Sequence, residues 1–356
     1  MTNLRAFLPA LLGLALFLAA SPAVAGDEPP PYGASDLVLE EEGLDDGWEV
    51  SYDELSGTLG EEKMESWIGT VAQSAGVDDD AFLAEIRVLK GPESTAATLA
   101  VVEVDEEAKA LAETLEQRGK ALGYLVRSLG HPTRLLLVEG PDAARQAVEA
   151  MQLRYAVRSL SNLGFERLNA GSQVGAIAFA KGAQSIQKKA GAPLVLLGMA
   201  ASKLEQFPDA LEAFRAGFKE GVPAPAEGRL AMRGNAFYGH VLLKSEGKAP
   251  AQEAVKALER AVALEKYADK DDTTFATRQN LARAYVRVGD MDKAFQMLEK
   301  ALEMGKVKLG VAQLMGYIRG QVVTAEEWKP LLEDRRFTSV VERVTGQSAD
   351  DDDEGL

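Results

Sequence analysis

The feature that most constrains this chain is a pattern of small and apolar residues that returns after 34 positions. A Leu-Gly pair at Leu163-Gly164 is followed 34 residues later by Leu197-Gly198, and Ala176 is matched by Ala210 at the same offset. A third segment, beginning at Leu281, repeats the spacing from the pair to the apolar residues that follow it. Because no single helix keeps all these positions on one face, the spacing predicts antiparallel helix pairs joined by short turns.

This spacing resembles that of the tetratricopeptide repeat, a helix–turn–helix unit of about 34 residues. The resemblance covers residues 157–308, with a looser extension to 346, and implies an all-α helical-repeat solenoid. The predicted boundaries are clear units at 157–190, 191–224 and 275–308, a degenerate unit at 225–274 and a C-terminal cap at 309–346. The cap is expected to cover the open end of the array with Trp328, Leu331, Leu332, Phe337 and Val340. A helical bundle without repeat symmetry is the alternative.

The turns inside the repeats depend on single residues. Gly171 and Gly289 stand where a first helix ends, and both can take the left-handed conformation that closes it. Glu205 occupies this position in the second unit, so its turn must close without glycine. In the Leu-Gly pairs, the glycine is expected to let the partner helix approach closely.

Residues 36–140 lack the repeat. Strands are expected in the segments GWEVSYDEL, AEIRVLKG, TLAVVEV, YLVRSLG and TRLLLVEG, and helices in EEKMESWIGTVAQSAG and DEEAKALAETLEQRGKALG. This order predicts a small α+β domain with helices packed against a mostly antiparallel sheet. The segment resembles no family that we can identify.

The two ends of the chain have compositions of their own. Residues 1–25 are typical of a secretory signal peptide, with Arg5, the apolar run 6–20 and the small-residue site Ala23-Val24-Ala25. The alternative is an uncleaved membrane anchor. Residues 26–35 are predicted to be a linker and 347–356 a disordered acidic tail. A periplasmic or secreted location is therefore expected.

The composition argues against several kinds of chemistry. The chain has no cysteine, which rules out disulfides and thiolate metal sites, and only two histidines, His131 and His240. Neither histidine has a neighbouring motif that would orient it as a general base. The net charge of −16 argues against nucleic acid as the main partner. We therefore expect no enzymatic activity, no metal and no cofactor.

The resemblance implies that the first helices of the repeats line a concave surface that holds a peptide or a partner helix. Carried over in register, the partner-binding candidates are Arg158, Phe165, Asn169, Met199, Lys203, Gln279, Arg283 and Arg287. The basic members would favour an acidic partner. The family's lysine and asparagine clamp for acidic C-terminal tails is not reproduced, because Ser161 and Phe165 stand in its first positions.

These observations predict an exported, non-enzymatic scaffold that binds a partner peptide or protein through the concave face of the repeats. The alternative is a small-molecule or lipid-binding module in residues 36–140, with the repeats as its support. Enzymatic activity ranks third. The sequence leaves the identity of the partner and the oligomeric state open.

Overall fold

The structure, a computed structural model, describes residues 33–51, 60–92, 95–222, 228–268 and 274–347. The predicted signal peptide, residues 26–32 of the predicted linker and residues 348–356 of the acidic tail lie outside the described residues. The chain divides into two compact units, which we describe separately. Unit 1 comprises Met1–Ala200 with Ala216–Gly221, and unit 2 comprises Ala201–Arg215 with Val222–Leu356.

Unit 1 contains an antiparallel sheet of five strands. Their order is β1 (Glu49–Ser51), β2 (Phe82–Lys90), β3 (Ala96–Val104), β5 (Arg134–Glu139) and β4 (Leu125–Ser128). The central strand β3 pairs along its whole length with β2, from Phe82 opposite Val104 to Lys90 opposite Ala96. The predicted strands are all present, and the α+β class is confirmed.

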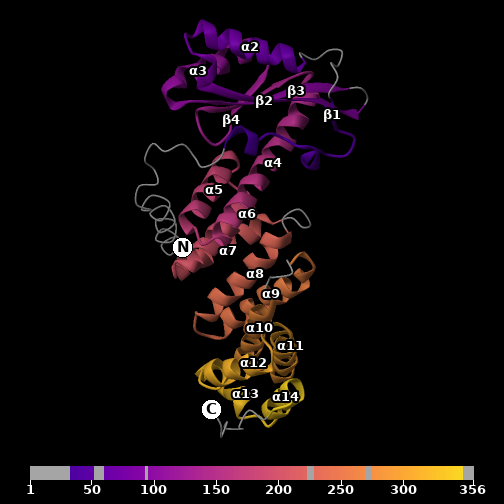
Figure 1. The fold of residues 1–356 in the computed structure, drawn as a ribbon, viewed down its shortest axis with the longest axis vertical. Helices are drawn as coiled ribbons and strands as arrows, with labels where there is room; N and C mark the ends of the chain where they lie inside the picture. Colours follow the sequence, from indigo (N-terminus) through magenta and orange to yellow (C-terminus); the bar gives the residue numbers. More distant parts are fainter. Residues whose placement is uncertain (1–32, 52–59, 93–94, 223–227, 269–273, 348–356) are drawn as a thin grey trace, which may run out of the picture. The chain divides into compact units, whose positions relative to one another are not determined.

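Helices cover both faces of this sheet (Figure 1). α2 (Glu61–Ser74) and α3 (Lys109–Ala121) pack on one face, and α4 (Asp142–Asn169) packs on the other. Successive β3 residues alternate between the two cores: Leu99 belongs to the α4 side and Ala100 to the α2–α3 side. Since side chains in a strand point alternately to opposite faces, a strand buried on both sides must be apolar throughout, as β3 nearly is.

Helix α4 crosses the domain boundary that the sequence suggested at residues 140–141. Its first half packs on the sheet through Val148 and Met151, whereas Leu160 lies beside Phe179 of α5 (Gln173–Ile186) in the same core. Because one continuous helix serves both the sheet and the first helix pair, the chain does not divide at its start. It divides instead in the hairpin of α6 (Gly191–Lys203) and α7 (Phe207–Glu220).

The predicted linker 26–35 ends earlier than expected. Residues 33–45, which we call the N-terminal strap, include two short 3-10 turns, η1 (Ala34–Asp36) and η2 (Glu41–Gly43). Ala34 is fully buried, and its N–H donates to Oε2 of Glu103 at 2.9 Å. The Gln152 side chain of α4 accepts from the N–H of Leu39 at 2.9 Å and donates to the carbonyl of Leu37. Residues 33–35 are therefore part of the fold, because their apolar and backbone groups are satisfied by α4 and the sheet.

The glycines of the Leu-Gly pairs lie where helices approach most closely. A Cβ added to Gly164 of α4 would stand 2.5 Å from Cδ2 of Leu196 and 2.9 Å from Cβ of Phe179. In unit 2 the equivalent residue is Gly239, where an added Cβ would stand 2.4 Å from Cγ of Leu258. Both distances are too short for any larger side chain, so the predicted role is confirmed at Gly164, and Gly239, which the sequence analysis did not single out, has the same role.

Unit 2 continues with two antiparallel helix pairs (Figure 1). The first is α8 (Gly228–Leu243) with α9 (Lys248–Ala263), and the second is α10 (Thr274–Val288) with α11 (Met291–Leu309). The α8–α9 turn is only residues 244–247, and Pro250 lies in the first turn of α9, where proline is tolerated. The extra length of the degenerate unit therefore falls in the connection 264–273, of which residues 264–268 are described and include η6 (Glu265–Tyr267).

The C-terminal residues of unit 2 form short elements. These are α12 (Val311–Tyr317), the π-helical turn η7 (Ile318–Val322), η8 (Glu326–Trp328), α13 (Lys329–Leu332) and α14 (Arg336–Thr345). Trp328, Leu331, Phe337 and Val340 are buried, and Leu332 is half-buried. Helix α14 packs on α11. The apolar residues of the predicted cap thus face the protein interior.

The turns inside the repeats differ in backbone strain. Gly171 and Gly289 have φ values of +88° and +86°, as predicted. Glu205 has a φ of +58° and is the one non-glycine residue with positive φ in the described part of the chain. The left-handed region brings Cβ of an L-residue close to the following carbonyl oxygen, at a cost of roughly 1–2 kcal/mol.

Replacing Glu205 with glycine should therefore stabilise the protein. We expect E205G to raise the free energy of unfolding by about 0.5–1 kcal/mol, because relief of the strain exceeds the extra chain entropy of glycine. Urea unfolding followed by circular dichroism measures this. The matched control is Glu303→Gly on the exposed face of α11, which should lose about 1 kcal/mol. Equal destabilisation by both changes would contradict the strain argument.

Candidate functional site

The candidate site is a groove between α8 and α10, with a volume of about 360 Å³. These are the first helices of the third and fourth predicted units, so the groove lies on the face that first helices present. Its lining residues are Met232, Arg233, Ala236, Phe237 and His240 from α8, and Thr274, Ala276, Thr277 and Asn280 from α10. The lining combines an apolar floor with an amide, two hydroxyls, an imidazole and a guanidinium.

The charge of these two helices opposes that of the whole protein. Neither α8 nor α10 contains a single Asp or Glu, although the chain has 55 acidic residues against 39 basic ones. The cationic residues of the two helices are Arg229, Arg233, Arg278, Arg283 and Arg287. The second helices α9 and α11, in contrast, carry glutamates. Both second helices also carry lysines, so among these four helices the difference is that acidic residues occur only in α9 and α11.

His240 lies in the middle of the groove and is half-buried. Burial lowers the pKa of its imidazole below the ordinary 6.5, and the charges of Lys244 and Arg283 lower it further. A hydrogen bond with the Asn280 side chain acts in the opposite direction. At neutral pH the ring is therefore uncharged, and it can take up a proton when a negative charge enters the groove.

Of the predicted residues, Arg283 lies close enough to this histidine to affect its pKa, and Arg287 neighbours Arg283. Arg283 is half-buried and forms an ion pair with Glu327 of η8, while burial and the neighbouring Arg287 lower its pKa. Arg287 is exposed and donates to the carbonyl oxygen of Ser245 at 3.1 Å. Arg287 therefore lies at the surface, whereas Arg283 is paired with Glu327.

Three predicted residues have side chains that are not accessible. Phe165, Met199 and Gln279 are 3%, 1% and 7% exposed. All three lie within two residues of a Leu-Gly pair or its equivalent, where the helix face turns toward its neighbours. Gln279 also accepts a hydrogen bond from the Tyr317 hydroxyl at 2.9 Å. These residues support the surface from within, and the expectation that they contact a partner directly needs correction. Asn169 is half-buried and Lys203 is exposed, and their role stays a prediction.

Arg158 is engaged by the chain itself. Its guanidinium lies 3.4 Å from the carbonyl and from Oε1 of Glu42 in the N-terminal strap. One turn earlier, Arg154 makes two bonds to the carboxylate of Asp45, at 2.7 and 2.8 Å. The strap therefore covers this part of the predicted surface. The strap is acidic and partly extended. Helix α4 binds it through the amide of Gln152 and the guanidinium groups of Arg154 and Arg158.

The α8 side of the groove was missed by the sequence analysis, because the degenerate unit received no site residues. A signal was present. When Tyr238-Gly239 is placed in register with the Leu-Gly pairs, the positions of Arg283 and Arg287 correspond to His240 and Lys244. Gly239 thus marks the position equivalent to the glycine of the Leu-Gly pairs, in a unit that is longer than 34 residues.

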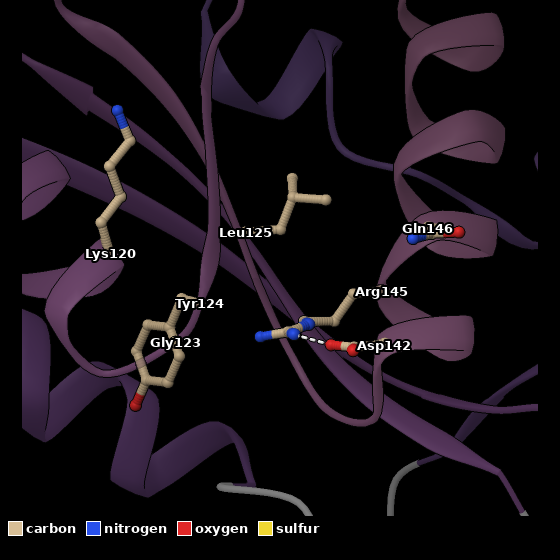
Figure 2. Close-up of a pocket in the computed structure, with 7 residues that line it drawn as sticks. All are labelled: Lys120, Gly123, Tyr124, Leu125, Asp142, Arg145 and Gln146. Atoms are coloured by element: carbon tan, nitrogen blue, oxygen red, sulfur yellow. Dashed lines mark hydrogen bonds and ion pairs between the residues drawn. The ribbon is translucent and has the colours of Figure 1, made fainter.

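A second, shallower hollow lies in unit 1, with a volume of about 210 Å³ (Figure 2). Its lining residues come from the end of α3 and the start of β4 on one side and from the first turns of α4 on the other. The cation nearest its centre, Arg145, is paired with Asp142, as Figure 2 shows. The arrangement offers no set of converging polar groups, so ligand binding by residues 36–140 stays a prediction without a specific observation in its favour.

Within the described ranges, no group of three His, Asp or Glu side chains is placed to hold a metal ion. In the same ranges, none of the helices combines the length and the apolar character needed to cross a membrane.

Residues 247–306 match the family model of the tetratricopeptide repeat. The match contains α9, α10 and most of α11, so this segment carries the tetratricopeptide repeat, and the predicted resemblance is confirmed there. The α10 side of the groove lies inside the matched segment, and α8 precedes it. Among curated proteins, no relative matches the sequence.

Solved structures with a detectable likeness include two of MamA. One is 17% identical, covering 46% of this chain and 92% of that one, with a TM-score of 0.31. The other is 16% identical, covering 56% and 94%, with a TM-score of 0.30. The APC/C hetero-tetramer Cut9–Hcn1 is 15% identical, covering 57% of this chain and 39% of that one, with a TM-score of 0.33.

Proposed function

We propose that the protein is a non-enzymatic interaction scaffold whose α8–α10 groove binds an acidic, extended segment of a protein partner. Stacked helical repeats commonly use such concave surfaces for binding. The observation that carries the proposal is that both helices that line the groove have cationic side chains and no acidic ones, in a chain with a net charge of −16.

The groove has suitable chemistry for this ligand. Phe237 and Met232 offer apolar contact to a side chain, and Asn280 can exchange hydrogen bonds with an extended backbone. Arg233 in the lining and Arg287 further along α10 can pair with carboxylates. The strap on α4 is a precedent inside the same chain, since Gln152 holds its backbone and Arg154 its carboxylate.

We further propose that the protein acts outside the cytoplasm, because residues 1–25 have the pattern of a signal peptide. Mass spectrometry of the protein from its native cells tests this. We expect a mature N-terminus at Gly26 and recovery from the exported fraction. An intact N-terminus at Met1 on a membrane-bound protein would show that the segment is retained as an anchor.

Filling the groove should prevent partner binding. Thr277 is half-buried in the groove lining, and T277W would place an indole where the ligand is proposed to lie. We expect at least about a tenfold loss of affinity, which corresponds to about 1.4 kcal/mol, for a partner captured by the intact mature chain. The control is Val307→Trp, because Val307 is 89% exposed and is not a groove residue. Equal affinity of T277W and the wild type would contradict the proposal.

Binding should also strengthen at lower pH. The free protein has a His240 pKa below 6.5, and a bound carboxylate would raise it, so binding takes up a proton. We expect affinity for an acidic peptide to increase about threefold from pH 7.5 to pH 5.5, within the limit of about tenfold per pH unit for one proton. Calorimetry in two buffers of different ionisation enthalpy measures the uptake. H240Q should abolish it, and persistence of the uptake in H240Q would assign the proton to another group.

A further inference from the structure

The last residues of the chain form its longest acidic run. Asp350 to Glu354 are five consecutive acidic residues, followed by Gly355 and the C-terminal Leu356. Other acidic runs, such as Glu40-Glu41-Glu42, have three members. The run lies outside the described residues, which end at Gln347.

Contacts in unit 2 lead from the start of this tail toward the groove. The carbonyl oxygen of Val344, near the end of α14, accepts a hydrogen bond from Nζ of Lys306 on α11 at 2.8 Å. The adjacent Gly305 is so close to α10 that an added Cβ would stand 2.9 Å from Cε2 of Phe275. Thr274, which lines the groove, has its hydroxyl 3.6 Å from Sδ of Met304. The tail therefore begins beside the α11 turn that touches the Thr274 end of the groove.

The tail is long enough to cover the remaining distance. Ten residues, 347–356, span up to about 33–36 Å when extended. One helix with its side chains is about 10–12 Å across. Residues 304–306 of α11 contact both Val344 and Thr274, so the tail starts one helix away from the groove lining, and its extended length exceeds the width of that helix.

We propose that this acidic tail occupies the α8–α10 groove of its own chain and competes there with the acidic segment of a partner. The proposal rests on the proposed function, since both ligands use the same cationic groups. The five acidic residues complement Arg233, Lys244 and Arg287 in charge. A tethered ligand also acts at an effective concentration in the millimolar range, so even a weak contact is largely formed.

Disulfide trapping tests the contact directly, because the chain has no cysteine of its own. The test variant combines Ala276→Cys, an exposed residue of the groove lining, with Gly355→Cys in the tail. The control combines Val307→Cys with Gly355→Cys. Val307 is highly exposed and next to Lys306, so it reports random collisions near the base of the tail. Under mild oxidation we expect at least about a fivefold faster cross-link, within one molecule, in the Ala276 pair than in the control.

Replacing Asp350 to Asp353 with asparagine should remove this preference without changing the tether. Equal rates in the two pairs would overturn the proposal, because the tail would then sample the surface at random. Cross-links that form only between two molecules would overturn it as well and would identify a second copy as the source of the tail. Circular dichroism of each variant establishes that the helices are intact.

A second experiment separates this inference from the proposed function. A labelled ten-residue peptide of Asp, Glu and Leu is titrated against the mature chain and against the same chain ending at Gly346. If the tail occupies the groove, the shortened chain should bind the peptide at least about fivefold more tightly. Equal binding by both chains would overturn the tail proposal and leave the groove function standing. Absence of binding by the shortened chain would count against both.

Discussion

Reversing the charge of Arg233 and Arg287 should abolish most of the affinity for an acidic peptide. The double variant R233E/R287E replaces Arg233, which lines the groove, and Arg287, which is exposed further along α10, with carboxylates, so attraction at both positions becomes repulsion. Exposed ion pairs contribute about 0.2–1 kcal/mol each, and reversal doubles the change in charge. We expect the dissociation constant of a labelled peptide of Asp, Glu and Leu to rise at least tenfold. This rise corresponds to a loss of about 1.4 kcal/mol or more of binding free energy.

The matched control separates a local effect from the net charge of the protein. Lys300 of α11 and Arg335, just before α14, are exposed and do not line the groove. K300E/R335E changes the net charge by the same amount as R233E/R287E. We expect it to weaken binding by less than about twofold at 0.15 M salt, where exposed charges more than about 8 Å apart are largely screened. Similar losses in the two double variants would show that the peptide responds to the protein's overall charge and not to the groove.

The second large effect concerns a buried ion pair in unit 1. The Arg134 side chain, on β5, is 2% exposed, and its Nε and Nη2 donate to Oε1 of Glu103 on β3 at 2.9 and 2.6 Å. Oε2 of the same carboxylate accepts from the N–H of Ala34 in the N-terminal strap. Glu103 thus neutralises a buried cation and connects the strap to the sheet.

Replacing Glu103 with glutamine keeps the shape and removes the charge. We expect E103Q to lower the free energy of unfolding of unit 1 by about 3 kcal/mol, because the buried guanidinium of Arg134 loses the carboxylate charge that accepts two of its hydrogen bonds. Hydrogen exchange of the β3 and β5 amides measures this unit separately from unit 2. The control is Glu116→Gln, which breaks the exposed pair with Lys120 and should change stability by less than about 0.5 kcal/mol. A loss below about 1 kcal/mol in E103Q would contradict the expected role of the buried pair.

Much of the fold follows from local sequence patterns. The 34-residue spacing predicted the helix pairs, and alternation in segments such as TLAVVEV predicted the strands. Gly171 and Gly289 marked turns that have positive φ, and the position of Glu205 identified the one turn without glycine. These features could be predicted because helix periodicity, strand alternation and turn conformation depend on residues close together in the chain.

The candidate site could be predicted only in part. Arg283 and Arg287 were predicted by register within a regular repeat; Arg283 lies near His240, and both lie on α10, which lines the groove. Arg233, Phe237 and His240 were missed because the third unit does not keep the 34-residue length. Phe165 and Met199 were predicted to be accessible but are buried. Register gives the position of a residue along a helix, whereas its exposure depends on which neighbouring helices pack beside it.

The sequence by itself determined the class of fold, the turns of the repeats and the exclusion of cysteine chemistry, since each depends on composition or on spacing within one or two helices. Only the tertiary structure decided that α4 serves both the sheet and the first helix pair, that the strap covers Arg158, and that Glu103 meets Arg134. It also decided that α8 and α10 together enclose the groove. The physical reason is that these contacts join residues 31 to 116 positions apart, or helices of different repeats, and no local periodicity specifies such a pairing.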